Sequence, residues 1–328
     1  MEQVEEVIIG TSKQTSNPSN IGRHALLLAN YPESVPGYSV QQEGASGLMA
    51  VAEGFMSIKA GNAKLVMAGG AESMSQIPLE IEGSRFVPFN ENSKIIFDPI
   101  SEMEIGAQPE SKYGKLTRQD IAKATAKQYG VSDDAAAAYA KKSAEKANAT
   151  DFSAGMIPVE VRVKKDMVAI DTDNIGEGDL IAKGADAAGI VILSEEETAS
   201  KEGMATLAEV LSAGFGASTP TDVVSAMDVA IQNALKKADL SLSDVDVIEM
   251  DEPSAAQGVA MEQKLIAGGA DAAKINVAGG ALATGGAWGG MGGALLVKLV
   301  HILKAGQKGL VVMSADGGQA TALLIEKK

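Results

Sequence analysis

Residues 41–48, QQEGASGL, form the corner on which the fold prediction depends. A strand-like run, residues 38–42, leads into the corner, and a helix-like run, residues 48–60, follows it. In enzymes that use such a corner as a nucleophile turn, its side chain lies at the helix N-terminus, where partial positive charge favours a thiolate. Here the corner residue is Gly44, and the chain contains no cysteine. The sequence therefore predicts the turn without its nucleophile.

The composition is that of an ordinary soluble globular protein. The chain has 328 residues, enough for about two domains, and 45% of them are hydrophobic. Its formal net charge of −15 excludes nucleic acid and anionic membrane surfaces as expected partners. Without cysteine there are no disulfides and no thiolate metal sites. The first ten residues lack a signal-peptide pattern, so a cytoplasmic protein is predicted.

Alternating strand and helix patterns predict parallel α/β layers. The clearest helix spans residues 222–238, where apolar residues recur at three- and four-residue steps. A glycine-rich tract follows an apolar strand twice, at residues 68–70 and 278–280, which suggests two related halves. The predicted strands cover residues 7–11, 37–41, 64–68, 189–193, 206–213, 245–250, 275–278, 309–314 and 320–325.

The region between the halves differs from both. Residues 76–183 contain polar loops, two helical runs at 118–129 and 133–148, and a mixed-charge run. We interpret this region as a loop domain inserted into the first half. The predicted division is an N-terminal half, residues 1–199, and a C-terminal half, residues 200–328.

Together these motifs resemble the thiolase family over almost the whole chain. Residues 45–48 match its nucleophile turn, and residues 68–75 (AGGAESMS) match the end of the following strand. Residues 20–23 match its NxxR segment, residues 276–285 the strand before its glycine–histidine–proline turn, and residues 316–319 its closing glycine-rich hairpin. The resemblance implies an α/β fold of two duplicated halves in a layered α/β/α/β/α arrangement with an inserted loop domain.

The first half is shortened at its N-terminus relative to this family. Residues 7–11 correspond to the second strand of the family, and its opening strand, expected at the centre of the sheet, has no counterpart. Another chain could supply that strand, residues 7–11 could take its place, or the sheet could close without it. An unpaired strand edge favours association with another chain.

The resemblance also shows where thiolase chemistry fails. The nucleophilic cysteine of the family falls on Gly44, its histidine on Gly286, its second cysteine on Ser314 and its asparagine on Asp251. An oxyanion-binding glycine falls on Asp316. Loss of one oxyanion donor costs about 10²–10³ in rate, and loss of the nucleophile removes the covalent route. We therefore expect neither thiolysis nor Claisen condensation.

Structural interpretations of these positions compete with functional ones. Gly44 is expected to relieve backbone strain at the corner, and Asp251 could cap the helix predicted at residues 254–266. Alternatively, Glu43, Asp251 and Asp316 converge near Ser314 as an acid/base group or a divalent-cation site. We favour hydrogen-bonded side chains that plug an inactive site, and no metal is predicted.

Two classes of function remain open. In the first, the chain is a non-catalytic thiolase-like subunit that binds acyl-CoA weakly or not at all. In the second, it is an enzyme of altered chemistry on a coenzyme A thioester, a hydrolase or decarboxylase that uses Glu43, Asp251, Ser314 and Asp316. No cofactor is required in either. The resemblance implies a homodimer, or a heteromer with a related chain, paired through the strand at residues 37–42.

Overall fold

The structure is a computed structural model that describes residues 3–81 and 96–328. Its first four-stranded sheet pairs β1 in parallel with both β2 and β3, and pairs β3 antiparallel with β8. After Glu6, the residues of β1 are uncharged and buried, as expected for an inner strand of a parallel sheet. In spatial order, the strands are β2 (Gly37–Val40), β1 (Glu6–Gly10), β3 (Leu65–Ser73) and β8 (Asp186–Ser194).

The second sheet also has four strands, in a related order. It pairs β10 in parallel with β11, β11 antiparallel with β12, and β12 antiparallel with β9. In both sheets a strand with a small-residue C-terminal end, β3 or β11, pairs antiparallel with the strand that closes its half. In spatial order, the strands are β10 (Val247–Met250), β11 (Lys308–Ala315), β12 (Gln319–Lys327) and β9 (Ala208–Ala217).

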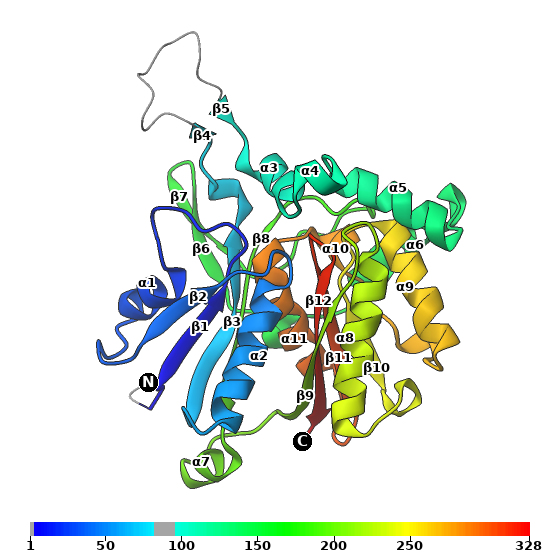
Figure 1. Ribbon diagram of the computed structural model, residues 1–328. Coiled ribbons are helices and arrows are strands. Elements are labelled where there is room, and N and C mark those ends of the chain that lie inside the picture. Colours follow the sequence, from blue (N-terminus) through cyan, green and yellow to red (C-terminus); the bar gives the residue numbers. More distant parts are fainter. Residues whose placement is uncertain (1–2, 82–95) are drawn as a thin grey trace.

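Two helices, α2 (Ser46–Lys59) and α11 (Met291–Ile302), lie between the sheets and contact strands of both (Figure 1). Small residues let them approach closely. A Cβ on Gly293 would lie only 1.9 Å from the backbone oxygen of Gly189, and one on Gly47 only 2.3 Å from that of Gly289. The core of the molecule is therefore this central helical layer and the two sheet faces that it covers.

Outer helices complete the α/β/α/β/α arrangement. On the second sheet, α8 (Val223–Ala238) packs on β9, β12 and β11 through the predicted apolar stripe, which includes the buried Met227 and Ile231. On the first sheet, α1 (Ile21–Leu28) packs on β1 and β2. The predicted α/β fold with layered halves is thus confirmed. Among the described residues, no helix is long and apolar enough to cross a membrane.

The predicted insertion leaves the first sheet after β3 and returns at β8. Its two expected helices are present, with capping side chains from Thr117 and Ser132. Residues 82–95 of the predicted insertion lie outside the described residues. The remaining elements are β4 (Glu80–Ile81), β5 (Ile96–Phe97), α3 (Pro99–Gly106), α4 (Glu110–Tyr113), α5 (Arg118–Tyr129), α6 (Asp133–Asn148), β6 (Val159–Val163), β7 (Asp166–Ile170), α7 (Glu196–Lys201), α9 (Ala255–Ala267) and α10 (Ala281–Thr284).

One predicted strand, residues 275–278, is wrong. Only a single bridge joins Ile275 to Ile248. Asn276 has a φ of 42°, outside the strand region, and its side chain accepts a hydrogen bond from the Met250 amide at 2.6 Å and donates one to the Met250 carbonyl at 3.1 Å. An asparagine side chain here takes the place of a strand ladder beside β10.

The expected central place of the missing opening strand is also wrong. In the second half the opening strand, β9, lies at the edge of the sheet beside β12. In the first half β1 lies directly between β2 and β3, so the sheet closes without a gap. The position equivalent to β9 is the outer edge of β8, where the described part of the chain places no strand.

Candidate active site

The site lies where the parallel strands of both sheets end. The carboxyl ends of parallel strands meet at one edge of each sheet, which is where α/β proteins place their ligands. Across this edge, the side chain of Glu72 on β3 accepts hydrogen bonds from Thr11 Oγ1 at 3.0 Å and from the Ser12 amide at 2.6 Å. It also accepts one from the Gly289 amide of the second half at 3.3 Å. Glu72 therefore joins the two halves at the site.

At the strand-to-helix corner, the residue with a strained backbone conformation is Glu43 and not Gly44. Glu43 has a φ of 44°, in the left-handed region that a non-glycine residue enters at a cost. Its carbonyl accepts hydrogen bonds from the hydroxyls of Ser12 and Ser46, both at 2.6 Å. Gly44 itself does not have a left-handed φ. The expectation that glycine at position 44 relieves strain is therefore wrong.

The packing around the two key glycines differs. A Cβ on Gly44 would meet one atom within 4 Å, the Ser314 backbone oxygen at 3.0 Å. A Cβ on Gly286 would meet its nearest atom, Ala182 Cβ, at 3.5 Å, an ordinary contact. A side chain at position 286 would therefore fit without change, whereas one at position 44 would press on the Ser314 carbonyl and require a small shift.

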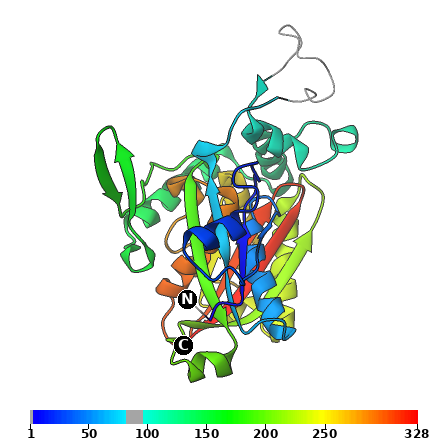
Figure 2. The ribbon, with the colours of Figure 1, turned by 90° about the vertical axis from the view of Figure 1, so that its left-hand side faces the viewer.

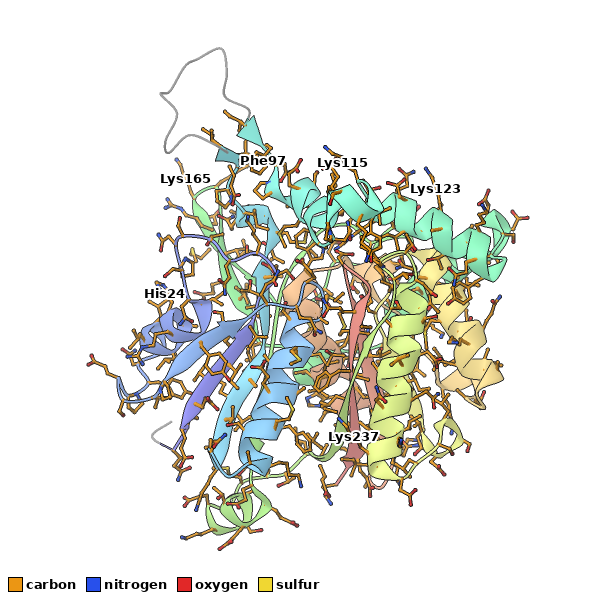
Figure 3. All side chains as sticks on the ribbon, in the orientation of Figure 1. His24, Phe97, Lys115, Lys123, Lys165 and Lys237 are labelled. Atoms are coloured by element: carbon orange, nitrogen blue, oxygen red, sulfur yellow. The ribbon has the colours of Figure 1, made fainter. Side chains whose placement is uncertain are left out.

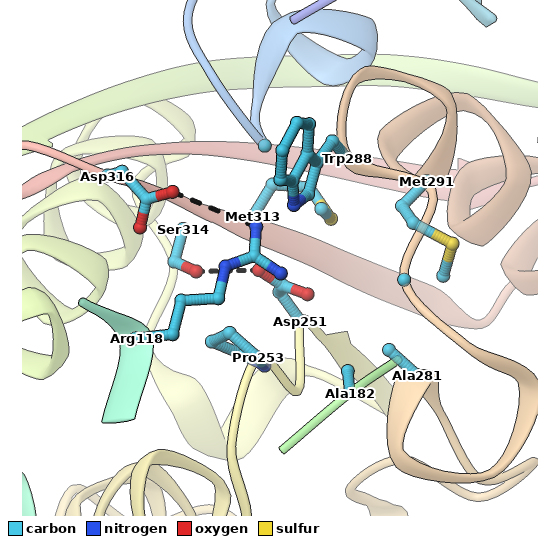
Figure 4. Close-up of a pocket in the computed structure, with 12 residues that line it drawn as sticks. Arg118, Ala182, Asp251, Pro253, Ala281, Trp288, Met291, Met313, Ser314 and Asp316 are labelled. Carbon is cyan, nitrogen blue, oxygen red and sulfur yellow. Dashed lines mark hydrogen bonds and ion pairs between the residues drawn. The ribbon is translucent and has the colours of Figure 1, made fainter. Parts of the chain in front are cut away.

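The predicted positions converge on one small cavity. Gly44, Asp251, Gly286, Ser314 and Asp316 all line it, and its volume is about 30 Å³ (Figure 4). That volume has room for about two water molecules. The Glu43 side chain does not line the cavity but accepts a hydrogen bond from Gln41 Nε2 at 2.9 Å.

Arg118, which sequence reasoning missed, fills the space beside these residues. It is the first residue of α5, and its guanidinium lies over the ring of Trp288, with 4.9 Å from Cζ to the ring centroid. Its Nη2 is 3.7 Å from Asp316 Oδ2, and its Nε is 3.3 Å from Glu104 Oε1. Its side chain is 13% exposed. The site thus contains its own cation.

No sequence motif distinguishes Arg118 from the other basic residues of the insertion. Trp288 could have been found, because it is the only tryptophan of the chain and lies in the glycine-rich tract. Both residues also line a second, outer cavity of about 590 Å³, together with Met74, Ile100 and Glu104 among others. Arg118 and Trp288 therefore form a wall shared by the inner and outer cavities.

The acidic side chains of the site hold their protons more strongly than usual. Burial raises the pKa of Asp251 to about 6, against the lowering effects of the hydrogen bond from Ser314 and the charge of Arg118. Burial and the nearby Asp316 raise the pKa of Glu43 to about 7. Burial also raises the pKa of Asp316, while Arg118 opposes the rise. Near neutral pH the cluster therefore exists in mixed protonation states.

Ser314 Oγ donates a hydrogen bond to Asp251 Oδ2 at 2.6 Å (Figure 4). The hydroxyl and the carboxylate thus form a pair without a histidine. Both histidines of the chain lie elsewhere: His24 is exposed on α1 (Figure 3), and His301 is in the last turn of α11. The geometry supplies acids and a hydrogen-bonded serine, and no imidazole to activate it.

The expected capping role of Asp251 is wrong, because the N-cap of α9 is Ser254, whose side chain accepts from the Gln257 amide. The neighbouring Glu252 is structural. It accepts hydrogen bonds from Tyr139 at 2.9 Å and from Ser143 at 2.7 Å. Within residues 3–81 and 96–328, no group of three or more histidine, cysteine or acidic side chains is arranged to hold a metal ion.

Comparison with known proteins agrees with this architecture. The thiolase N-terminal domain matches residues 1–186, and the thiolase C-terminal domain matches residues 204–327. A β-ketoadipyl-CoA thiolase of Pseudomonas knackmussii is 33% identical, in an alignment that covers 99% of this chain and 88% of the relative. An acetyl-CoA acetyltransferase of Escherichia coli is 30% identical with the same coverage.

Solved structures show the same fold. An acetyl-CoA acetyltransferase of Bacillus anthracis superposes with a TM-score of 0.89 at 27% identity, covering 100% of this chain and 88% of the other. Human mitochondrial 3-ketoacyl-CoA thiolase in complex with CoA superposes with a TM-score of 0.86 at 26% identity, covering 100% of this chain and 87% of the other. From its sequence, its two matching domains and its fold, this chain belongs to the thiolase family.

Proposed function

We propose that this chain is a thiolase-family protein without thiolase activity, a non-catalytic subunit that acts beside a related thiolase-like chain. The observation that carries the proposal is the pair of glycines at positions 44 and 286. Both line the cavity, and neither supplies a side chain that could act as a nucleophile or as a base. A site without a nucleophile cannot form an acyl-enzyme, whatever else it binds.

The size and charge of the cavity support the same proposal. Ligand pockets usually measure about 300–1,000 Å³, and the inner cavity, at about 30 Å³, is far smaller. Asp316 stands where the resemblance places an oxyanion donor, so its carboxylate would oppose the charge that develops on a thioester oxygen. Arg118 is already engaged with Asp316 and Glu104 and closes the inner cavity toward the outer one.

A coenzyme A thioester remains the ligand that we propose for the outer cavity, bound weakly and without turnover. The volume of about 590 Å³ lies in the usual range for small-molecule sites. We propose no cofactor and no metal, and a cytoplasmic location. For assembly we propose pairing through β2, which is an edge strand of the first sheet, with a second copy or with a related thiolase-like chain.

A second candidate function follows from the Ser314–Asp251 pair. Its hydrogen bond of 2.6 Å and the raised pKa of Asp251 resemble an acid/base arrangement, with Glu43 and Asp316 as further carboxylates. Such a site would act on a coenzyme A thioester by hydrolysis or decarboxylation. We rank it second, because a carboxylate with a pKa of about 6 is a weak base toward a serine hydroxyl.

The deciding experiment measures turnover by the purified protein. The chain is incubated with acetyl-CoA alone, and with acetoacetyl-CoA plus CoA, beside the variants Asp251→Asn and Gly44→Ala. We expect no product above the blank with any of the three proteins. Acetyl transfer by the wild type would overturn the proposal. Hydrolysis or decarboxylation that Asp251→Asn abolishes and Gly44→Ala preserves would establish the second candidate instead.

A further inference from the structure

Two buried hydrogen-bond donors of the inner cavity have no acceptor. Among the described residues, the indole Nε1 of Trp288 makes no hydrogen bond, and neither does the Nε of Arg118. Both residues line the cavity, and the indole nitrogen points into the group of side chains around it (Figure 4). Trp288 is only 5% exposed. Because a buried donor without an acceptor destabilises the fold, these nitrogens indicate a ligand that supplies an acceptor oxygen.

The other polar side chains of the cavity wall are acidic or bonded to an acid. Ser314 Oγ donates a hydrogen bond to Asp251 Oδ2 at 2.6 Å, and Asp316 Oδ2 lies 3.7 Å from Nη2 of Arg118. With one cation beside two carboxyl groups, an anion that entered alone would be repelled. A carboxylate that enters with a proton avoids this repulsion, since two neighbouring carboxyl groups can share one proton.

The size of the cavity limits the ligand to a few atoms. Its volume of about 30 Å³ has room for about two water molecules. Formate, the smallest carboxylate, has three non-hydrogen atoms and is of comparable size. The wall also offers apolar contacts for its C–H group, from Ala281, Met291 and Met313. The donors, the acids and the volume together fit a very short carboxylic acid.

We propose that the inner cavity is a binding site for a small monocarboxylate of formate size, taken up together with one proton. One oxygen of the ligand accepts hydrogen bonds from Trp288 Nε1 and Arg118. The proton comes from solvent and lies between the other oxygen and the carboxylate of Asp251. No covalent bond of the ligand forms or breaks, so the site exists whether or not the protein turns over a coenzyme A thioester.

Uptake of a proton gives the binding a defined pH dependence. Burial raises the pKa of Asp251 to about 6, so this group is ionised in the unliganded protein above that pH. Each carboxylate bound there takes up one proton, and its affinity falls about tenfold for each pH unit. The other charged or titratable side chains that face this group are Arg118 of α5, Glu104 of α3, Glu43 of the corner and Asp316 after β11.

The experiment follows the emission of Trp288, the only tryptophan of the chain. Sodium formate replaces sodium chloride at constant ionic strength. A ligand of three non-hydrogen atoms binds with a Kd of about 1 mM at best, so the titration extends to about 100 mM. We expect a saturable change whose midpoint rises about tenfold between pH 7 and pH 8. Formamide has the same size and no charge, so any binding of formamide should not weaken over this interval.

Variants assign the response to the cavity. Gly286→Ala adds a methyl group whose nearest neighbour lies at 3.5 Å, so it takes up cavity space without a clash. It should weaken formate binding about tenfold or more, because little space is left for the ligand. Gly106→Ala, whose Cβ would meet no atom within 4 Å, is the matched control and should bind formate normally. Asp251→Asn should remove the pH dependence, because an amide takes up no proton.

Proton uptake is also measured on the unmodified chain, by calorimetry in buffers of different ionisation enthalpy, so the test does not depend on a variant that folds. One proton taken up per formate supports the proposal, and none overturns it. The proposal also fails if neither emission nor calorimetry shows saturable formate binding. Equal loss of affinity for formate and formamide between pH 7 and pH 8 would overturn it as well, since the shared proton would then not be the cause.

Discussion

The two sheets of this molecule differ at one edge: among the described residues, β12 is paired on both sides, whereas β8 is paired on one side only (Figure 2). Apolar residues on β12 and β8 face outward in the same way, yet Leu324 is 0% exposed and Ile192 is 57% exposed. Among the described residues, β9 and α8 cover β12 of the second sheet, and no strand or helix lies in the equivalent position beside β8. An apolar strand is thus not buried by its own composition, and its burial depends on the element that packs against it.

The largest expected effect compares these two leucine-sized side chains directly. Leu324→Ala should lower the free energy of unfolding by about 2–5 kcal/mol, because it leaves a cavity under α8. Ile192→Ala should change it by less than about 0.5 kcal/mol, because that side chain is exposed. Urea unfolding of both variants measures the difference. Equal losses would mean that β8 is covered in the isolated chain, and the contrast between the sheets would fail.

A second contrast concerns buried charge. Glu249 on β10 is 0% exposed, and burial raises its pKa to about 7, whereas the parallel inner strand β1 carries the apolar residues Val7, Ile8 and Ile9. A carboxyl with a raised folded-state pKa adds stability below its unfolded pKa of about 4.5 and loses it as pH rises through 7.

Glu249→Gln should therefore flatten the decline in stability between pH 5 and pH 8, by about 3 kcal/mol at most. Urea unfolding at several pH values across this interval measures the change. Glu196→Gln, at an exposed position, serves as the control and should leave the pH profile unchanged. A profile that Glu249→Gln does not alter would place the titrating groups elsewhere, with Glu43 and Asp251 as the next to test.

A third prediction concerns the contact between the insertion and the second half. Arg118→Ala should cost about 1–2 kcal/mol at pH 8, because Asp316 and Glu104 lose their cation. Trp288, the only tryptophan, should report the change directly through its fluorescence, since the guanidinium lies over its ring. Arg118→Lys keeps the charge and serves as the matched variant. An unchanged Trp288 emission in Arg118→Ala would show that the ring and the guanidinium are not in contact in solution.

The smallest expected effect is at the corner itself. Gly44→Ala should change stability by less than about 1 kcal/mol, because the new Cβ has one close neighbour at 3.0 Å and the φ is ordinary. Gly70→Ala is the contrasting variant, because its Cβ would lie 1.9 Å from the backbone oxygen of Gly289. Thermal unfolding compares the two. A large loss of stability in Gly44→Ala would mean that the packing requires glycine at position 44.

Much of this fold could be predicted from the spacing of apolar residues along the sequence. The helix at residues 222–238 and the helix pair of the insertion were predicted within a residue at each end, because apolar spacing and capping side chains mark them. The site could also be anticipated, because residues that end neighbouring parallel strands meet at one edge. Gly44, Asp251 and Ser314 indeed line one cavity.

The features that the sequence did not predict depend on contacts between residues that lie far apart in the chain. Nothing local to Arg118 shows that its side chain reaches Trp288, 170 positions later in the sequence. The strand expected at residues 275–278 failed because the Asn276 side chain bonds to β10 in place of a ladder, a local competition that apolar composition does not reveal. The edge position of the missing strand required the pairing order of the second sheet, which only the structure supplies.

The hydrogen bonds of Glu72 have a consequence for movement within the protein. Its carboxylate ties Thr11 and Ser12 of one half to Gly289 of the other, so a hinge opening between the halves would break buried bonds on both sides. Arg118, at the start of α5, lines both the inner and the outer cavity. Local opening of α5, without rotation of the two halves, would therefore be enough to join the two cavities.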